Sequence, residues 1–315
     1  MNVPDLRVNI GTLHLKNPIL VASGTFGYGS EYGRFVDIAH LGGIVTKTLT
    51  PEPWPGNPPP RAAETASGML NSIGLQNVGV AAFIEEKLPY LQTIDSALVV
   101  NVGGGPADEF VHVTERLADC PGIDAFEINM SCPNVSGGMD FSTDPGQAAA
   151  LISRLRKLTD RPLIAKLTPN VTDITEIAAA VEDAGADAIS AINTIRAMAI
   201  DPETRRPKLG ATMGGLSGPA IKPVAVGAVW RIAGRVRIPV IGIGGIADVN
   251  DALEFLIAGA SAVQVGTSNF VSPKTGTDIV DALTTWCSQR DIRTVRDIVG
   301  SIQLPSQEAI PCQHS

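Results

Sequence analysis

Short apolar runs alternate along the chain with longer segments in which apolar residues recur at helical spacing. The runs are rich in Val, Ile, Leu and Ala, which is typical of buried strands. The predicted strands are Ile19–Ser23, Gly43–Lys47, Ala97–Val102, Ala125–Asn129, Leu163–Leu167, Ala188–Ile192, Val240–Ile243 and Ala262–Val265. The predicted helices are Glu31–Ala39, Ala81–Leu91, Ala107–Leu117, Gln147–Leu158, Ile174–Ala184, Ile221–Ala233, Val249–Ala258 and one that begins at Asp278.

Strands that alternate with helices indicate βαβ units and therefore a parallel sheet. Eight such units in a chain of 315 residues fit a TIM (β/α)8 barrel, and we expect a single domain over residues 1–315. Two segments exceed the usual loop length, the Pro- and Gly-rich residues 48–77 and residues 193–219. Both follow a predicted strand, so we expect them as insertions at the C-terminal face, where active sites of this fold lie.

The ends of the predicted strands carry a coherent polar set. Lys47 and Lys166 each end an apolar run, which favours an amine at the barrel mouth over the usual solvated lysine. Single asparagines at strand ends are often turn residues. Together, the lysines and asparagines indicate an anionic ligand with an amide-rich ring. The strand-end residues are Ser23, Gly24, Lys47, Thr48, Asn101, Asn129, Lys166, Asn193, Thr194, Gly244, Gly245, Gly266 and Thr267.

Glycines follow the last two predicted strands, in Ile243-Gly-Gly-Ile-Ala-Asp248 and Val265-Gly-Thr267. The loops after strands seven and eight hold phosphate in many TIM barrels, and a helix N-terminus favours negative charge. We therefore expect a phosphorylated ligand there. Gly242-x-Gly-x-x-Ala247 also matches the Rossmann fingerprint, but it comes late and the next strand ends without an acidic residue for a ribose.

Cys132 lies in Glu127-Ile-Asn-Met-Ser-Cys-Pro-Asn134, where a predicted strand gives way to the glycine-bearing loop 135–139. A free cysteine is most often a small buried hydrophobe. Its place at a strand exit between two asparagines makes this thiol a candidate active-site base. Residues 135–140 could close over a substrate with Gly137 and Gly138 as hinges, and a static surface loop is the alternative.

The composition excludes several function classes. The net charge is −8 without a basic cluster, which argues against nucleic acid and anionic membranes as partners. Cysteines 120, 132, 287 and 312 form no C-x-x-C pair, so we expect no metal or iron–sulfur cluster on this chain. The first residues lack a signal-peptide pattern and no apolar run could span a bilayer, which predicts a cytoplasmic protein.

The motifs together resemble the class 1 dihydroorotate dehydrogenases, in order over nearly the whole chain. Glu64-Thr-Ala-Ser-Gly-Met-Leu70 and Gly74-Leu-Gln-Asn77 look like class 1B, the NAD-dependent, two-subunit form. The class 2 enzymes carry an N-terminal extension and a serine base, and neither is seen here. The motifs that carry the resemblance are Lys47-Thr48, Gly56-Asn-Pro-Pro-Pro-Arg61, Asn71-Ser-Ile-Gly-Leu-Gln-Asn77, Asn129-Met-Ser-Cys-Pro-Asn134, Lys166-Leu-Thr-Pro169, Ile192-Asn-Thr194 and Gly242-Ile-Gly-Gly245.

This resemblance implies FMN across the barrel mouth, with Lys166 near the N1–C2 carbonyl edge of the flavin. It implies that Cys132 removes the C5 proton of dihydroorotate while hydride leaves C6 for flavin N5. The implied phosphate site is Gly244, Gly245, Gly266 and Thr267, and the other FMN contacts are Ser23, Lys47, Thr48, Asn101, Asn129, Lys166, Ile192 and Gly218. The implied substrate contacts are Lys47 at the carboxylate with Asn71, Ser72, Ile73, Gly74, Leu75, Asn129, Asn193 and Thr194.

Class 1B membership further implies a partner subunit with FAD and a [2Fe–2S] cluster that passes electrons to NAD⁺. The expected assembly is a heterotetramer of two catalytic and two electron-transfer subunits. The expected reaction is the oxidation of (S)-dihydroorotate to orotate in pyrimidine (UMP) biosynthesis.

Four alternatives stay open at this point. A class 1A enzyme would be a homodimer that uses fumarate. A related flavin enzyme would oxidise neutral dihydropyrimidines, which lack the carboxylate for Lys47. A phosphosugar lyase or isomerase would use Lys166 as a Schiff-base amine. An inactive ligand-binding barrel is the fourth, and Cys132 argues against it. Residues 311–315 have no assigned role.

Overall fold

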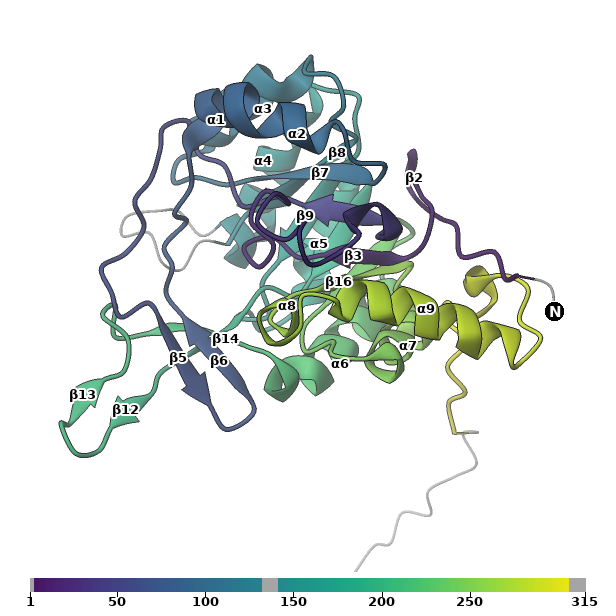
Figure 1. Cartoon of the computed structure of the whole chain (residues 1–315). Coiled ribbons are helices and arrows are strands. Elements are labelled where there is room, and N and C mark those ends of the chain that lie inside the picture. Colours follow the sequence, from purple (N-terminus) through teal and green to yellow (C-terminus); the bar gives the residue numbers. More distant parts are fainter. Residues whose placement is uncertain (1–2, 132–140, 306–315) are drawn as a thin grey trace, which may run out of the picture.

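Eight parallel strands close into a barrel in the computed structural model, which describes residues 3–131 and 141–305 (Figure 1). Each strand pairs with the next along the chain, and the last pairs with the first through Val263 opposite Ile19. The predicted TIM barrel is confirmed. The barrel strands are β3 (Ile19–Val21), β4 (Gly43–Val45), β7 (Ala97–Val102), β8 (Ala125–Asn129), β9 (Leu163–Leu167), β10 (Ala188–Ala191), β15 (Val240–Ile243) and β16 (Ala262–Val265).

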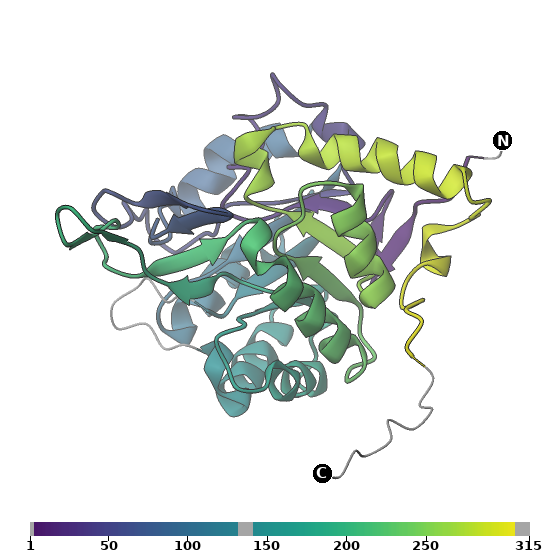
Figure 2. The same ribbon diagram turned by 90° about the horizontal axis from the view of Figure 1, so that it is seen from below.

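Helices surround the barrel, as the two perpendicular views show (Figures 1 and 2). The α-helices are α1 (Gly79–Ala82), α2 (Leu88–Leu91), α3 (Ala107–Ala118), α4 (Pro145–Arg156), α5 (Ile174–Asp183), α6 (Lys222–Ala233), α7 (Val249–Ala258), α8 (Ser268–Val271) and α9 (Thr275–Ser288). A π-helical turn, Phe83–Lys87, joins α1 to α2, and 3₁₀ turns cover Ile38–His40, Phe141–Thr143, Pro219–Ile221 and Val295–Asp297. Within the described residues, no helix is long and apolar enough to cross a bilayer.

The predicted helix Glu31–Ala39 is wrong. Separate turns occupy the segment, and the only helical piece is the 3₁₀ turn at Ile38–His40. Asp37 has an extended backbone, and its carboxylate accepts a hydrogen bond from Ala39 N. Asp37 is therefore the N-cap of the 3₁₀ turn and not an interior residue of a longer helix. Aspartate competes with helix hydrogen bonds in this way. Tyr32 stacks on Phe26 at 4.1 Å between ring centroids, so packing also favours the irregular path.

The barrel strands are buried on both faces, because the barrel interior covers one face and the helix layer the other. This explains why their sequences are continuous apolar runs. In β8 all five residues are buried, including the carboxylate of Glu127.

Both long insertions contribute strands to one antiparallel sheet outside the barrel. Residues 48–77 supply β5 (Ala62–Thr65) and β6 (Gly68–Asn71), and residues 193–219 supply β11 (Ile195–Ala197) and β14 (Gly214–Ser217). Gly215 of β14 lies opposite Asn71 of β6, which joins the two insertions. The sequence pattern predicted the position of these insertions but not their pairing.

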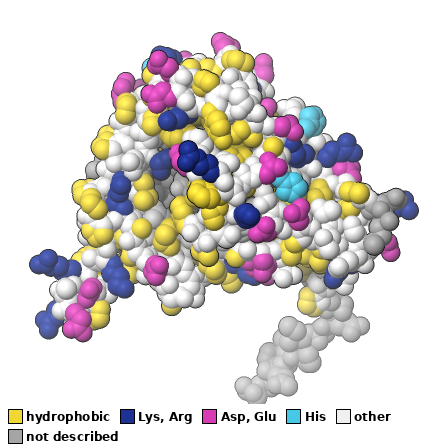
Figure 3. Space-filling model, viewed as in Figure 1, with side chains coloured by type: hydrophobic (Ala, Val, Ile, Leu, Met, Phe, Trp, Pro, Cys, Tyr) yellow, Lys and Arg dark blue, Asp and Glu magenta, His cyan; other side chains and the backbone are white. Residues whose placement is uncertain are grey.

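Two small hairpins complete the fold. β1 (Val8–Ile10) pairs with β2 (Leu13–Leu15), and the turn between them approaches Asp187 at the start of β10, so this hairpin lies at the amino-terminal end of the barrel. β12 (Ile200–Asp201) pairs with β13 (Arg206–Pro207) at the far end of the second insertion. Figure 3 shows basic and acidic side chains together over this second hairpin, and charges of both signs are also dispersed over the rest of that face.

Candidate functional site

A cavity of about 560 Å³ opens at the carboxyl ends of the barrel strands, under the sheet formed by the two insertions. Most of the residues predicted from the sequence meet there. Cys132 and loop 135–140 lie outside the described residues. The predicted residues that line the cavity are Ser23, Lys47, Thr48, Asn71, Ile73, Gly74, Leu75, Asn129, Lys166, Ile192, Asn193, Thr194, Gly218, Gly244, Gly245, Gly266 and Thr267.

Ser72 and Asn101 are predicted site residues that do not line the cavity. Both are completely buried. The backbone N–H of Ser72 bonds the carbonyl of Arg61 at 2.8 Å, which ties β6 to its neighbouring strand. Asn101 lies in β7, one layer below the cavity floor, where its side chain contacts Glu127. Successive side chains of a strand point to opposite faces, and the sequence position of a residue does not show how deep in the barrel its side chain lies.

Lys47 lies at the cavity wall directly after β4, where Lys47 N bonds the carbonyl of Gly27 at 3.0 Å. Its ammonium forms no ion pair with any described carboxylate. Burial lowers the pKa of Lys47 below 10.5, the nearby Arg61 lowers it further, and Glu31 opposes both effects. A partly buried cation without a partner is a site for an anionic group.

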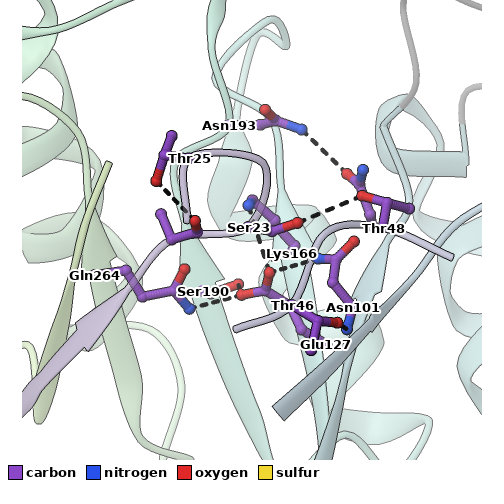
Figure 4. Close-up of polar contacts among 12 residues, drawn as sticks. Ser23, Thr25, Thr46, Thr48, Asn101, Glu127, Lys166, Ser190, Asn193 and Gln264 are labelled. Carbon is purple, nitrogen blue, oxygen red and sulfur yellow. Dashed lines mark hydrogen bonds and ion pairs between the residues drawn. The ribbon is translucent and has the colours of Figure 1, made fainter. Parts of the chain in front are cut away.

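An amide wall lies at the exits of β8 and β10, and Figure 4 shows Asn193 in it. Asn193 Nδ2 donates to Asn129 Oδ1 at 3.1 Å and to Ser131 Oγ at 2.8 Å. Thr194 N donates to Asn193 Oδ1 at 2.8 Å, which fixes the amide of Asn193. These bonds order the polar edge of the cavity before any ligand binds.

Glycines build the third side. Gly244 and Gly245 have φ of +130° and +75°, and a Cβ on Gly245 would lie 2.9 Å from the carbonyl oxygen of Gly218. No described residue accepts a hydrogen bond from the N–H groups of Gly244, Gly245 or Gly266. Free N–H groups around a concave turn form an anion site.

The N-terminus of α7, which the sequence suggested as part of this anion site, is capped by carboxylates of its own segment. Asp248 caps α7 by accepting hydrogen bonds from Asn250 N and Asp251 N, and Asp251 accepts from Ala247 N at 2.8 Å. These carboxylates already satisfy the N–H groups of Asn250 and Asp251 within the first turn and of Ala247 and Asp248 before it. The glycine backbone is therefore the source of free donors.

Below the floor lies a buried network that the sequence did not reveal. The Glu127 carboxylate accepts from Asn101 Nδ2 at 2.6 Å and Ser190 Oγ at 2.8 Å. It also accepts from Gln264 Nε2 at 2.7 Å and pairs with Lys166 Nζ at 3.4 Å (Figure 4). The signal was present, since Glu127 is a charged residue inside an apolar strand.

Other cavity residues were missed because they come from the insertion sheet and from α8. Met69 and Ser217 belong to β6 and β14, and Phe270 belongs to α8. Thr267 Oγ1 donates to Ser217 Oγ at 2.8 Å and so links the glycine wall to the sheet. In the described part of the chain, no group of three His, Cys, Asp or Glu residues could hold a metal ion.

Comparisons with known proteins agree with this geometry. The family model for dihydroorotate dehydrogenase matches residues 5–286. A Trichlorobacter lovleyi protein named dihydroorotate dehydrogenase B (NAD(+)), catalytic subunit, is 51% identical over 95% of this chain and 99% of its own. A Geotalea uraniireducens protein of the same name is 50% identical over 96% and 99%. The crystal structure of DHODH from Eimeria tenella in complex with ferulenol superposes with a TM-score of 0.78 at 25% identity, and covers 95% of this chain and 88% of that one. A match over so much of the chain, on a barrel whose strand ends carry these residues, means that the chain belongs to the dihydroorotate dehydrogenase family.

Proposed function

We propose that this chain oxidises (S)-dihydroorotate to orotate in pyrimidine biosynthesis, with FMN bound in the cavity at the barrel mouth. The observation that carries the substrate assignment is Lys47, a partly buried cation on the cavity wall without a carboxylate partner among the described residues. A dihydroorotate carboxylate supplies the missing charge, whereas a neutral dihydropyrimidine would leave it unpaired.

The residues present fit FMN. The free N–H groups of Gly244, Gly245 and Gly266 suit its phosphate, and all three glycines line the cavity without a side chain to fill it. Lys166 lines the floor with 6% of its surface exposed, which suits an electron-rich ring edge. When bound, FMN would supply the acceptor for the hydride that leaves C6 of the substrate.

The side chains of this chain have separate tasks in the proposed reaction. Lys47 holds the substrate carboxylate, and the ordered amides of Asn129 and Asn193 hold the ring's amide edge. Cys132, as thiolate, takes the proton from C5. The proton and the hydride together account for the two hydrogens that dihydroorotate loses.

One purification tests this proposal. The chain should show a flavin spectrum that dihydroorotate bleaches and dihydrouracil does not. A colourless protein that binds phosphosugars would overturn it in favour of a lyase or isomerase, and bleaching by dihydrouracil alone would assign a neutral dihydropyrimidine as substrate.

We further propose that a partner subunit with FAD and a [2Fe–2S] cluster passes the electrons to NAD⁺, in an assembly of two catalytic and two electron-transfer subunits. The support is that the relatives are named catalytic subunits of NAD(+)-linked enzymes. The reduced chain should be reoxidised by NAD⁺ only when it is co-expressed with that partner. Rapid reoxidation by fumarate without a partner would favour the class 1A alternative.

Gly266→Ala is expected to weaken FMN binding roughly tenfold or more, about 1.4 kcal/mol, without changing the stability of the FMN-free chain. The added Cβ would meet only Ala22 Cβ at 3.7 Å and Thr25 Cγ2 at 4.0 Å, so the protein accepts it while the ligand loses the space. Gly227→Ala on the exposed face of α6 is the control, since its Cβ meets nothing within 4 Å. Fluorescence titration with FMN measures both variants, and wild-type affinity in Gly266→Ala would contradict the phosphate assignment.

The pH profile of kcat/KM is expected to be bell-shaped. Activity rises as the Cys132 thiol, ordinarily near ~8.5, becomes thiolate. It falls as Lys47 loses its charge, and this begins below 10.5 because burial lowers the pKa of Lys47. Arginine stays charged over this range, so Lys47→Arg should lose the descending limb even if its absolute activity is low. If chemistry is rate-limiting and kcat/KM does not rise with pH through the titration range of a thiol, that result would argue against Cys132 as the base.

A further inference from the structure

Glu127 is completely buried, and the reaction proposed above does not use it. Four side-chain donors surround its carboxylate, from Asn101, Lys166, Ser190 and Gln264. They come from four other barrel strands, β7, β9, β10 and β16, so the carboxylate is the hub of the layer beneath the cavity floor. A buried charge persists only when it is paired and hydrogen-bonded in this way.

The carboxylate determines how its neighbours are oriented. An ionised carboxylate only accepts hydrogen bonds, so Asn101 and Gln264 must turn their NH₂ groups toward it. Their carbonyl oxygens consequently face away from Glu127, as Figure 4 shows, and neither has a hydrogen-bond partner among the described residues. Glu127 thus orients the amide dipoles of Asn101 and Gln264, with their NH₂ groups toward its carboxylate and their carbonyl oxygens away from it.

Lys166 is the member of this network that reaches the cavity. It lines the floor, whereas Glu127 does not, and the Nζ to Oε1 distance is 3.4 Å. The side chains are 8% and 0% exposed, so water screens the pair poorly. The negative charge of Glu127 therefore offsets the positive charge that Lys166 directs at a ligand on the floor.

We propose that Glu127 is a positioning residue that anchors Lys166 under the flavin and holds down the reduction potential of bound FMN. This inference rests on the proposed function, because it requires FMN on the cavity floor. Reduction adds negative charge to the flavin, which Lys166 favours and Glu127 disfavours. Without the Glu127 carboxylate, the positive charge of Lys166 on the cavity floor is unbalanced. Reduced FMN is then stabilised relative to oxidised FMN.

The test is the midpoint potential of the FMN-loaded chain and of Glu127→Gln, measured by dye-linked titration. The variant should bind reduced FMN more tightly relative to oxidised FMN by roughly tenfold or more, which is an upward shift of about 30 mV for a two-electron couple. An unchanged or lower potential overturns the proposal. Glu127→Asp keeps the negative charge but moves it away from Lys166, so its midpoint potential should lie between those of wild type and Glu127→Gln. If Glu127→Gln fails to fold, a wild-type potential in Glu127→Asp also overturns the proposal.

Ser190→Ala is the matched control, since it removes one 2.8 Å hydrogen bond to the same carboxylate and leaves both charges. It should lower the unfolding temperature without moving the potential. A purely structural Glu127 would instead give Glu127→Gln and Ser190→Ala the same pattern, and that result rejects the proposal. A wild-type chain that binds no FMN would reject the proposed function itself, which separates the two failures.

Discussion

Cys132→Ala is expected to retain FMN and to lose roughly 10²–10⁴-fold in dihydroorotate turnover, the usual contribution of a positioned general base. The described residues on its N-terminal side carry the expectation. Asn129 and Ser131 both line the cavity, and the Asn193 amide holds Ser131 Oγ at 2.8 Å. The described chain on the N-terminal side of Cys132 therefore ends at the wall of the cavity.

The control for this variant is Cys120→Ala. Cys120 follows α3 and precedes β8, so it lies toward the amino-terminal end of the barrel, away from the cavity, and its Sγ contacts the carbonyl of Arg116 at 3.4 Å. Its turnover should equal that of wild type. Stopped-flow bleaching of the flavin isolates the chemical step, and near-wild-type bleaching in Cys132→Ala would remove the base role from this residue.

Lys47→Met is expected to raise the KM for dihydroorotate roughly 30-fold or more, since loss of one partner of a buried charge pair costs about 2–5 kcal/mol. Methionine keeps an unbranched side chain that is one atom shorter, and it removes the charge together with the N–H donors of the ammonium. Lys87→Met is the control, because Lys87 is also partly buried but pairs with Glu86 at 3.6 Å away from the cavity. Steady-state kinetics measure both variants, and an unchanged KM in Lys47→Met would contradict the carboxylate assignment.

The same substitution should stabilise the ligand-free chain. The folded-state pKa of Lys47 is lowered, which means that folding disfavours its charged form. This penalty is fully present below the folded-state pKa, decreases as pH rises above it, and is gone above the unfolded-state value of 10.5. At neutral pH Lys47→Met should therefore raise the unfolding temperature of the apo chain, whereas Lys87→Met should not. Sites that bind a ligand tightly often reduce stability in this way.

Local sequence pattern was sufficient for the barrel and for most of the site. Strands such as Ala125–Asn129 and Leu163–Leu167 have the bounds expected, because a buried parallel strand is a continuous apolar run between turns. The strand-end residues then converge because every parallel strand ends on the same face.

What the sequence missed depends on contacts between distant residues. The pairing of Asn71 with Gly215 involves short strands rich in glycine, which have weak strand propensity and no local mark of their partner. Glu127 was expected only as a strand residue, since its role arises from donors on four other strands. The sequence also did not reveal that the Asp248 carboxylate caps α7 itself. The α7 terminus was therefore expected to contribute to the phosphate site.

The sheet formed by the two insertions also limits how the substrate range of this enzyme can be changed. Asn71 comes from the first insertion, Thr194 lies at the start of the second, and Gly215 lies between them, where a Cβ would clash with Thr194 Oγ1. In a chimera that exchanged only one insertion for that of a relative, the two insertions would no longer be complementary at this contact. Transplanting both together is the smallest exchange that keeps the roof of the cavity intact.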